Sequence, residues 1–269
     1  KQSPVASAAL YTSLEFLQNT EKLKTKHKIK CKILTSFNST KIVDIKNELD
    51  EIFNDGYKTI KVKVGKNLKE DLKRINLIQN NISSRGKIRI DANRGYSEKD
   101  ACEFVKNIAP DFIELFEQPC DANNWEANSK VAKISKIPIM LDEPICSIQD
   151  ILKAAQIDNI KFCKLKLKRF LSMMKLKEAI EVAHSNKLKV ILGDGLGGPI
   201  NCWMEARIAD QLINNDGEYN GFIKIKKDFN YLEKPIKFQN GDIVIDENWI
   251  PKVDEKKLMT LTKRQFTLF

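Results

Sequence analysis

The stretch "DFIELFEQPC", residues 111–120, shows a pattern that recurs along the chain: an apolar run that ends on a charged residue. An apolar run ends on a carboxylate, Glu117, and Pro119 follows two positions later. The run predicts a buried strand, and the proline predicts its end because proline cannot donate to a strand ladder. Glu114 falls on the other face of this strand because successive side chains alternate. Glu117 needs a partner, since burying an unpaired charge costs several kcal/mol.

Similar apolar runs recur along the chain, separated by amphipathic stretches of helical period. Leu68, Leu72, Ile75 and Ile78 form one helical stripe, and Ser97 is placed to cap the next helix. Strands that alternate with helices indicate βα units feeding a parallel sheet. With 111–118, the expected strands are 29–37, 59–65, 87–92, 137–143, 161–167, 189–195 and 221–225. Eight such units predict an α/β fold of the (β/α) barrel type.

Composition narrows the class of protein. The chain has 269 residues, 46 Lys and Arg, 36 Asp and Glu, and a formal charge of +10. The lysines are spread along the whole chain, so we expect no nucleic-acid partner. Six cysteines stand singly, which disfavours zinc and disulfides. No apolar run approaches the roughly 20 residues of a membrane span, and the first residues lack a signal-peptide pattern. We expect a cytoplasmic protein without membrane contact.

Charged side chains stand at the ends of successive expected strands, where a (β/α) barrel carries its chemistry. Three neighbouring carboxylates repel one another unless a cation lies among them, and oxygen ligands suit a hard divalent ion, Mg²⁺ first. Lysines flank the carboxylates in strand order. The polar strand-end residues are, in order, Lys61, Lys63, Asp91, Asn93, Glu117, Asp142, Glu143, Lys164, Lys166 and Asp194.

Several segments together resemble the enolase superfamily, in particular the muconate lactonizing subgroup of the mandelate racemase/muconate lactonizing enzyme family. They are "KVKVG", "RIDANRGYS", "IELFEQP", "PIMLDEP" and "ILGDG". The resemblance implies a (β/α)7β barrel whose N-terminal α+β capping domain is largely absent from this chain. Residues 1–28 would then be a linker helix from cap to barrel, 29–230 the catalytic barrel, and 231–269 a C-terminal segment completing the cap.

The resemblance also implies the site. Asp91, Glu117 and Asp142 match the ligands of Mg²⁺, with Mn²⁺ as an alternative ion, and Lys63 matches one acid/base lysine. On the sixth barrel strand Lys166 is favoured by counting back from Gly193, with Lys164 second and Lys168 third. The family's Gly-Gly pair then falls on Leu171 and Ser172, a departure from its pattern.

Further residues are expected to bind substrate or support these groups. Dipeptide epimerases of the family often carry an Asp-x-Asp pair on strand eight for a substrate ammonium, and "GEYNG" offers Glu218 and Asn220 there. Asp194 either faces the substrate or caps a loop. The expected supporting residues are Lys61, Asn93, Glu143, Lys164, Asp194, Glu218 and Asn220.

The implied reaction removes the proton alpha to a substrate carboxylate through a metal-stabilised enediolate. Neither His27 nor His184 falls at a strand end, which leaves Lys-Lys chemistry. The leading hypothesis is a racemase or epimerase of acylamino acids or dipeptides, acting on a small-molecule carboxylate and forming a homo-oligomer. A muconate-type cycloisomerase or an o-succinylbenzoate synthase-like dehydratase is the alternative, and a metal-binding barrel without turnover is a third hypothesis.

Overall fold

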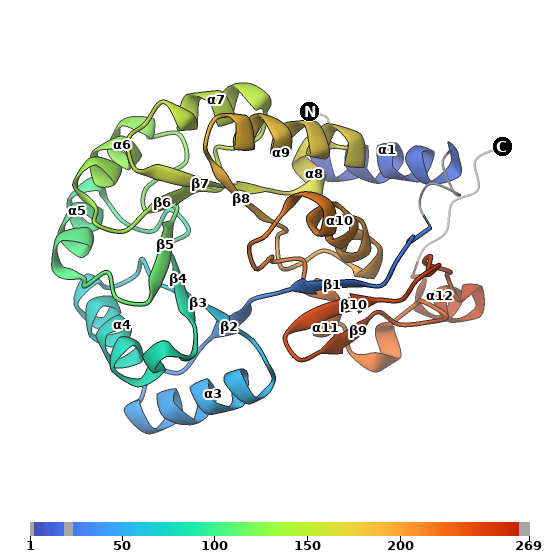
Figure 1. Cartoon of the computed structure of the whole chain (residues 1–269), viewed down its shortest axis with the longest axis horizontal. Coiled ribbons are helices and arrows are strands. Elements are labelled where there is room, and N and C mark those ends of the chain that lie inside the picture. The colour runs from blue at the N-terminus through green and yellow to red at the C-terminus, as the bar shows by residue number, and fades with distance from the viewer. Residues whose placement is uncertain (1–2, 19–23, 264–269) are drawn as a thin grey trace.

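A parallel sheet curls through the centre of the molecule (Figure 1). The computed structural model describes residues 3–18 and 24–263. Each expected strand from the second to the seventh is present, and each is one to four residues shorter than predicted. The strands, in spatial and chain order, are β2 (Thr35–Phe37), β3 (Thr59–Lys63), β4 (Lys87–Asp91), β5 (Ile113–Glu117), β6 (Ile139–Leu141), β7 (Ile160–Leu165) and β8 (Lys189–Leu192).

Helices follow the strands and cover the outside of the sheet (Figure 1). Ser97 caps α5, as expected, by accepting a hydrogen bond from the Asp100 amide at 3.1 Å. The longer helices are α3 (Ile42–Asn54), α4 (Leu68–Ile82), α5 (Glu98–Asn107), α6 (Trp125–Ile134), α7 (Ile148–Ala155), α9 (Met173–Ser185) and α10 (Pro199–Leu212). The shorter turns are the 3-10 helices Ser83–Arg85 and Lys227–Phe229, α8 (Leu167–Phe170) and α11 (Gly221–Lys224).

The eighth strand was predicted at the wrong place. Residues 221–224 form α11, and the position next to β8 is taken by Gly217 and Glu218. The Glu218 amide donates to the Leu192 carbonyl at 2.8 Å, and the Gly217 amide donates to the Lys32 carbonyl at 2.9 Å. The Leu34 amide completes the link by donating to the Gly217 carbonyl at 3.0 Å. The two edges of the curled sheet are therefore joined through residues 217–218, which gives the expected barrel.

The first expected strand, 29–37, is divided between two sheets. Its first half, β1 (Ile29–Lys32), pairs antiparallel with β10 (Asp242–Ile245), which in turn pairs with β9 (Lys237–Gln239). Its second half, β2, pairs parallel with β3. The chain changes sheet at Ile33, whose amide donates to the Gly241 carbonyl at 3.0 Å. Part of the segment 231–269 is thus attached directly to the start of the barrel.

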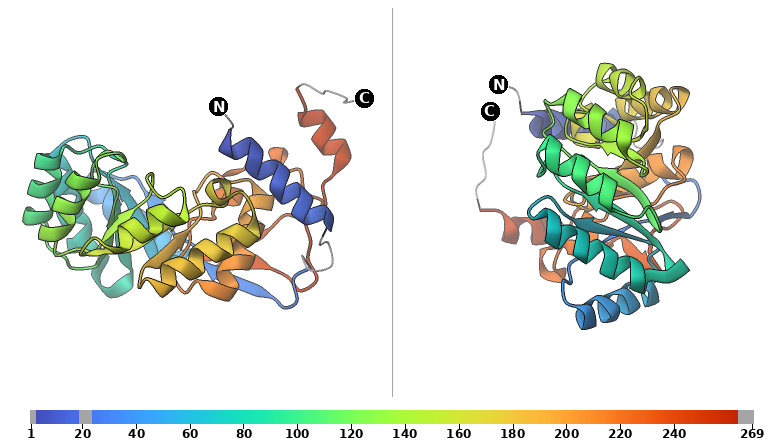
Figure 2. Two further views of the ribbon diagram at one scale, coloured as in Figure 1. Left: turned by 90° about the horizontal axis from the view of Figure 1, so that it is seen from above. Right: turned by 90° about the vertical axis from the view of Figure 1, so that its left-hand side faces the viewer.

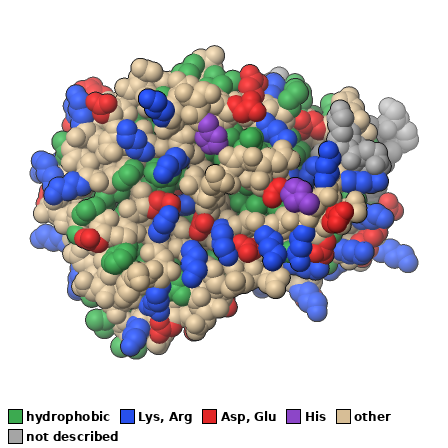
Figure 3. All heavy atoms as spheres, in the orientation of Figure 1, with side chains coloured by type: hydrophobic (Ala, Val, Ile, Leu, Met, Phe, Trp, Pro, Cys, Tyr) green, Lys and Arg blue, Asp and Glu red, His purple; other side chains and the backbone are tan. Residues whose placement is uncertain are grey.

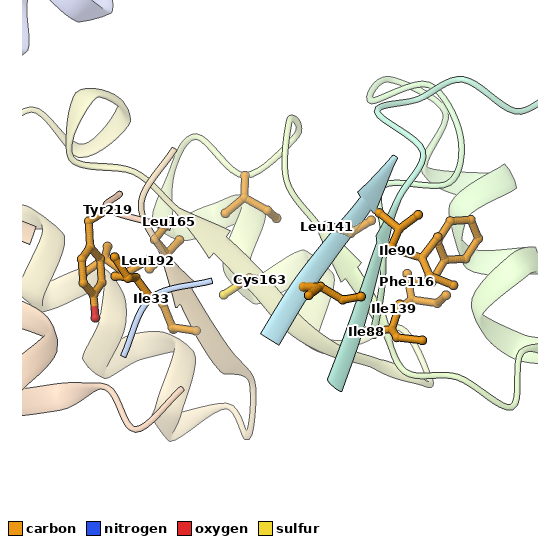
Figure 4. Packing of buried hydrophobic residues seen from close by; sticks show 14 of the residues in the cluster. Ile33, Ile88, Ile90, Phe116, Ile139, Leu141, Cys163, Leu165, Leu192 and Tyr219 are labelled. Atoms are coloured by element: carbon orange, nitrogen blue, oxygen red, sulfur yellow. The ribbon is translucent and has the colours of Figure 1, made fainter. Parts of the chain in front are cut away.

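Buried apolar side chains lie on both faces of the sheet because side chains alternate along each strand. The larger cluster lies between strands and helices, and Figure 4 shows Ile88, Ile90 and Phe116 close together in it. The smaller cluster fills the inside of the barrel and consists of Leu115, Met140, Phe162 and Ile191. Two residues after Leu115, Met140 and Phe162 the inward side chains are charged, namely Glu117, Asp142 and Lys164, which places the site at the carboxyl ends.

The two ends of the described chain lie at the same end of the molecule (Figure 2). Helix α1 (Pro4–Gln18) lies within the expected linker 1–28 and packs on α8, and α12 (Glu255–Leu261) lies within 231–269. Residues 1–2, 19–23 and 264–269 of those two segments fall outside the described residues. The Glu15 carboxylate binds α1 to the first turn of α9 by accepting from the Met173 amide at 2.9 Å.

The surface carries charges of both signs. On the face drawn in Figure 3, Lys and Arg side chains are distributed widely and lie among Asp and Glu side chains. This face therefore shows no single basic patch. None of the helices in residues 3–18 and 24–263 combines the length and the hydropathy of a transmembrane segment.

Candidate active site

The predicted site residues gather at the carboxyl ends of adjacent strands. Lys63, Asp91 and Glu117 are the last residues of β3, β4 and β5, and the strand register pairs Lys63 with Asp91 and Asp91 with Glu117. Asp142 directly follows β6, and Lys166 directly follows β7. A cavity of about 360 Å³ opens over them. Glu117 does not line this cavity, since it has no exposed surface.

The two outer lysines each pair with a carboxylate of the neighbouring strand. Lys63 Nζ lies 2.5 Å from Asp91 Oδ2 and also contacts the side-chain oxygen of Asn93. Lys166 Nζ lies 2.8 Å from Asp142 Oδ2. The Lys63 side chain is 56% exposed and that of Lys166 is 12% exposed. Because Glu117 stands on the strand between those of Asp91 and Asp142, the lysines flank a row of three carboxylates from opposite ends.

Lys61 and Lys164 form a deeper, buried layer two residues earlier on the same strands. Lys61 Nζ lies 2.9 Å from Asp91, 2.6 Å from Glu117 and 3.0 Å from Glu218. Lys164 Nζ contacts Glu218 and lies 3.6 Å from Glu117. Both ammonium groups thus lie beneath the carboxylates and balance part of their charge.

The electrostatics of this buried group follow from burial and from the ion pairs. Burial lowers the pKa of Lys164, although Glu117 and Glu218 oppose the shift. Burial acts on Lys61 in the same sense, but the nearby carboxylates outweigh it and raise the pKa of Lys61 well above its ordinary value. Burial raises the pKa of Glu117 to about 7 against the effect of both lysines. In Glu218 the two lysines prevail over burial and lower the pKa.

The chemistry of the donor set, three carboxylates on adjacent strands, fits a hard divalent cation. Both oxygens of Glu117 and Oδ1 of Asp142 are buried without an aligned hydrogen bond from the described residues, although Lys61 lies 2.6 Å from Glu117 Oε2 and Arg169 lies 2.8 Å from Asp142 Oδ1. In residues 3–18 and 24–263, however, no three Asp, Glu, His or Cys side chains lie close enough together to hold a metal ion. The physical reason is that ammonium groups occupy the row. A cation would have to displace Lys63 from Asp91 and Lys166 from Asp142.

The other predicted residues line or support the cavity. The Asn93 amide donates to Asp91 Oδ1 at 2.8 Å, and Glu143 pairs with Arg94 at 3.2 Å. Asn220 donates to the Leu34 carbonyl at 2.7 Å. Glu218 is held by two lysines and therefore lacks a free charge for a substrate ammonium.

Asp194 serves the loop after β8 as well as lining the cavity. Its Oδ1 accepts the Leu196 and Gly197 amides at 2.8 Å each, and its Oδ2 lies 2.7 Å from Lys168 Nζ. Of the two roles considered for this residue, these contacts favour loop capping. They also give Lys168 a partner away from the carboxylate row.

Sequence reasoning missed two residues that hold Asp142. Arg169 Nη2 lies 2.8 Å from Asp142 Oδ1, and the Asp142 amide donates to Gln118 Oε1 at 2.9 Å. Burial would raise the pKa of Asp142, but Lys166, Lys164 and Arg169 lower it to about 2. Gln118 directly follows Glu117, so its position on the predicted strand end could have identified it. Arg169 lies on α8, and its charge is not distinguished from those of the neighbouring lysines.

Leu171 has a backbone conformation that agrees with the choice of Lys166. Its φ is 68° and its ψ is −43°, and the Ser172 amide donates to the Phe170 carbonyl at 2.7 Å across it. This is a tight three-residue turn with positive φ, which glycine adopts more easily than leucine. Counting from Lys166 places a family glycine at this residue, whereas counting from Lys164 does not.

Comparison with known proteins gives a consistent family. A family model described as "Enolase C-terminal domain-like" matches residues 44–248. An L-amino acid-D/L-Glu epimerase of Sulfurimonas denitrificans is 27% identical over 184 residues, covering 68% of this chain and 53% of the relative. An N-succinyl-L-Arg/Lys racemase of Bacillus cereus is 25% identical over 238 residues, covering 84% and 60%.

Solved structures agree on the fold. The muconate lactonizing enzyme from Pseudomonas putida superposes with a TM-score of 0.81 at 19% identity, covering 94% of this chain and 73% of that one. The chain spans about half the length of the curated relatives it matches. Since the family model matches most of the barrel and the site residues follow in the expected order, the chain belongs to the mandelate racemase/muconate lactonizing enzyme family of the enolase superfamily.

Proposed function

We propose that this protein removes the proton alpha to the carboxylate of a small-molecule substrate and returns it as a racemase or epimerase. The observation that carries the proposal is the order lysine, three carboxylates, lysine across five adjacent strand ends. Two potential acid/base groups thus stand at opposite ends of one anionic row. Racemisation needs such an arrangement, because the proton leaves from one face of the carbon and returns to the other.

The three carboxylates Asp91, Glu117 and Asp142 would hold Mg²⁺ or Mn²⁺, and the bound ion would stabilise negative charge that develops on the substrate carboxylate. In that state Lys63 and Lys166 would leave their aspartates and face the substrate. One of them, as the neutral amine, takes the proton, and the other, as the ammonium ion, gives one back. Lys61 and Lys164 remain beneath the carboxylates and hold them in place.

An acylated amino acid is the substrate class that the site supports best. A substrate with a free ammonium group needs an acid that is not already neutralised. Glu218 contacts both Lys61 and Lys164, and Asp194 is bound to Lys168 and two amides. The similarity to the N-succinyl-L-Arg/Lys racemase agrees with this choice, and the similarity to the epimerase makes dipeptides the second class to test.

The test is α-proton exchange. The protein is incubated with Mg²⁺ in D₂O with N-succinyl and N-acetyl amino acids of each hand, and with dipeptides, and loss of the α-proton signal is followed by NMR. Both hands of one substrate should exchange. Proton exchange in one enantiomer alone, together with formation of a cyclic or dehydrated product, would instead indicate cycloisomerase or dehydratase chemistry. If none of these acids exchanged its α-proton, the result would contradict proton abstraction.

Variants assign the lysines. Lys166→Ala should lower the rate of α-proton exchange of one enantiomer by at least about a hundredfold, and Lys63→Ala should lower that of the other enantiomer by a similar factor. Lys99→Ala, on the outer helix α5, is the matched control and should leave both rates unchanged. Full activity of Lys166→Ala towards both hands would remove Lys166 from the mechanism and direct attention to Lys164.

A further inference from the structure

A second and larger cavity lies at the opposite end of the barrel from the carboxylate row. Its volume is about 570 Å³. It is formed where the strands begin, since Lys87, Ile113 and Lys189 are the first residues of β4, β5 and β8. Its polar lining includes Glu114, Lys161, Lys187 and Lys189, and its aromatic lining consists of Phe112 and Phe162.

The charge of this cavity is positive and largely uncompensated. Lys161, Lys187 and Lys189 are exposed and take part in none of the ion pairs among residues 3–18 and 24–263. Among the described residues that line the cavity, the acidic side chain is that of Glu114. Two cations already neutralise it, because Arg89 Nε lies 2.5 Å from Glu114 Oε2 and Lys87 Nζ lies 3.3 Å from Glu114 Oε1.

Arg89 adds an unsatisfied donor behind this wall. Its side chain is fully buried inside the barrel, and its Nη1 donates to the Asp216 carbonyl at 2.7 Å. Its Nη2 has no hydrogen-bond partner within residues 3–18 and 24–263. A buried guanidinium nitrogen normally has one, so Arg89 leaves one cationic donor unsatisfied at this end of the barrel.

The rest of the lining is apolar and aromatic. Phe162 is buried, and Lys189 Nζ lies 5.6 Å from its ring centroid. Phe112 is 41% exposed at the rim, where its φ of 61° turns the chain into β5. Ile113 and Pro138 complete the apolar wall. The cavity thus combines an apolar, aromatic surface with three lysines that pair with no acid in the described part of the chain.

We propose that this end of the barrel binds a small aromatic anion, that is, a flat apolar group carrying phosphate, sulfonate or carboxylate. The volume lies within the range of about 300 to 1,000 Å³ that is usual for small-molecule sites. The aromatic part packs against Phe112 and Phe162, and the anionic part lies among Lys161, Lys187 and Lys189. This site is separate from the proposed active site and does not depend on the reaction proposed for it.

A purely structural role of the lysines is the competing explanation. Lys187 follows α9 by two residues, and a cation near the C-terminal end of a helix stabilises that helix through its dipole. This explanation predicts a loss of stability on substitution and no effect on binding. The two explanations therefore differ in a measurable way.

The probe for the test is 8-anilinonaphthalene-1-sulfonate, an aromatic anion whose fluorescence rises on binding. The double variant Lys161→Glu/Lys187→Glu should raise its dissociation constant at least about tenfold. The double variant Lys73→Glu/Lys99→Glu, on outer helices, makes the same change in net charge and should leave the constant within about twofold. Unchanged binding in the first variant, or equal weakening in both, would overturn the proposal.

A further variant tests the aromatic half of the site. Asparagine tolerates positive φ, so Phe112→Asn keeps the turn while removing the ring. It should weaken the probe at least about threefold and leave the displacement of the probe by inorganic phosphate unchanged. Unaltered probe affinity in this variant would show that the probe does not lie against Phe112 and would contradict the assigned position.

Discussion

Replacement of Lys61 by methionine should destabilise the protein in a pH-dependent way. The substitution keeps the length of the side chain and removes a charge that contacts Asp91, Glu117 and Glu218 within 3.0 Å. Asp91 would retain Lys63 at 2.5 Å and Glu218 would retain its contact with Lys164, whereas Glu117 would keep Lys164 only at 3.6 Å, so the loss falls mainly on Glu117. Removing one partner from a buried ion pair costs about 3 to 5 kcal/mol at neutral pH.

The sign of the pH dependence follows from Glu117. Its pKa is raised to about 7 in the folded protein, against about 4.3 in an unfolded chain. A carboxyl whose pKa is raised by folding destabilises the protein progressively as pH increases from the unfolded to the folded value. Without Lys61 the pKa of Glu117 should rise further. The loss of unfolding free energy in the variant should therefore be small near pH 5 and largest at pH 8.

Urea unfolding at pH 5 and pH 8 measures the effect. The loss of unfolding free energy should be at least about 1 kcal/mol greater at pH 8 than at pH 5. Lys63→Met is the matched control, because that side chain is 56% exposed and Asp91 keeps Lys61. It should cost less than about 1 kcal/mol. An equal deficit at both pH values, or a small deficit at pH 8, would refute the view that Lys61 neutralises Glu117.

Three further predictions address the backbone and the metal site. Leu171→Gly should raise the unfolding free energy by up to about 1 kcal/mol by relieving the positive φ, whereas Leu171→Ala should give no gain in the same urea titration. Gly221→Ala should lower the melting temperature sharply, because an added Cβ would lie 2.1 Å from the Gly197 carbonyl oxygen. Gly198→Ala is the control and should be tolerated, because its added Cβ would meet only Tyr231 Oη, at 3.1 Å. Glu117→Gln should weaken Mg²⁺ binding at least about tenfold in calorimetry, and an unaltered affinity, equal to that of the surface control Glu126→Gln, would exclude Glu117 from the ligands.

The fold could be predicted where the chain repeats its apolar runs, and not where the barrel closes. The strands β3 to β8 lie at the predicted runs, within a few residues, because most of their side chains are buried. The closing segment at Gly217 and Glu218 has no such run, because its inward side chain, Glu218, is charged. The segment closes the barrel through backbone hydrogen bonds. The apolar segment 221–225, which resembles a strand in sequence, contains helix α11 instead. The division of 29–37 at Ile33 was also hidden, because both halves are equally apolar.

The positions of the site residues could be predicted from strand ends, whereas their partners could not. The rule that parallel strands bring their carboxyl ends together was sufficient to group Lys63, Asp91 and Asp142. The contact of Lys61 with Glu218 joins residues 157 positions apart and exists only because the barrel closes. Arg169 reaches Asp142 from the short helix α8, a position that no periodicity in the sequence indicates.

The closing segment has a consequence for cooperativity. Glu218 contributes its amide to the bond with Leu192 and its carboxylate to the ion pairs with Lys61 and Lys164. If the barrel opened between β8 and residues 217–218, the two buried lysines would therefore lose their negative counter-charge at the same time. Sheet closure and charge neutralisation form one cooperative unit, so amide exchange at Glu218 should report on the electrostatic state of the buried lysines that its carboxylate contacts.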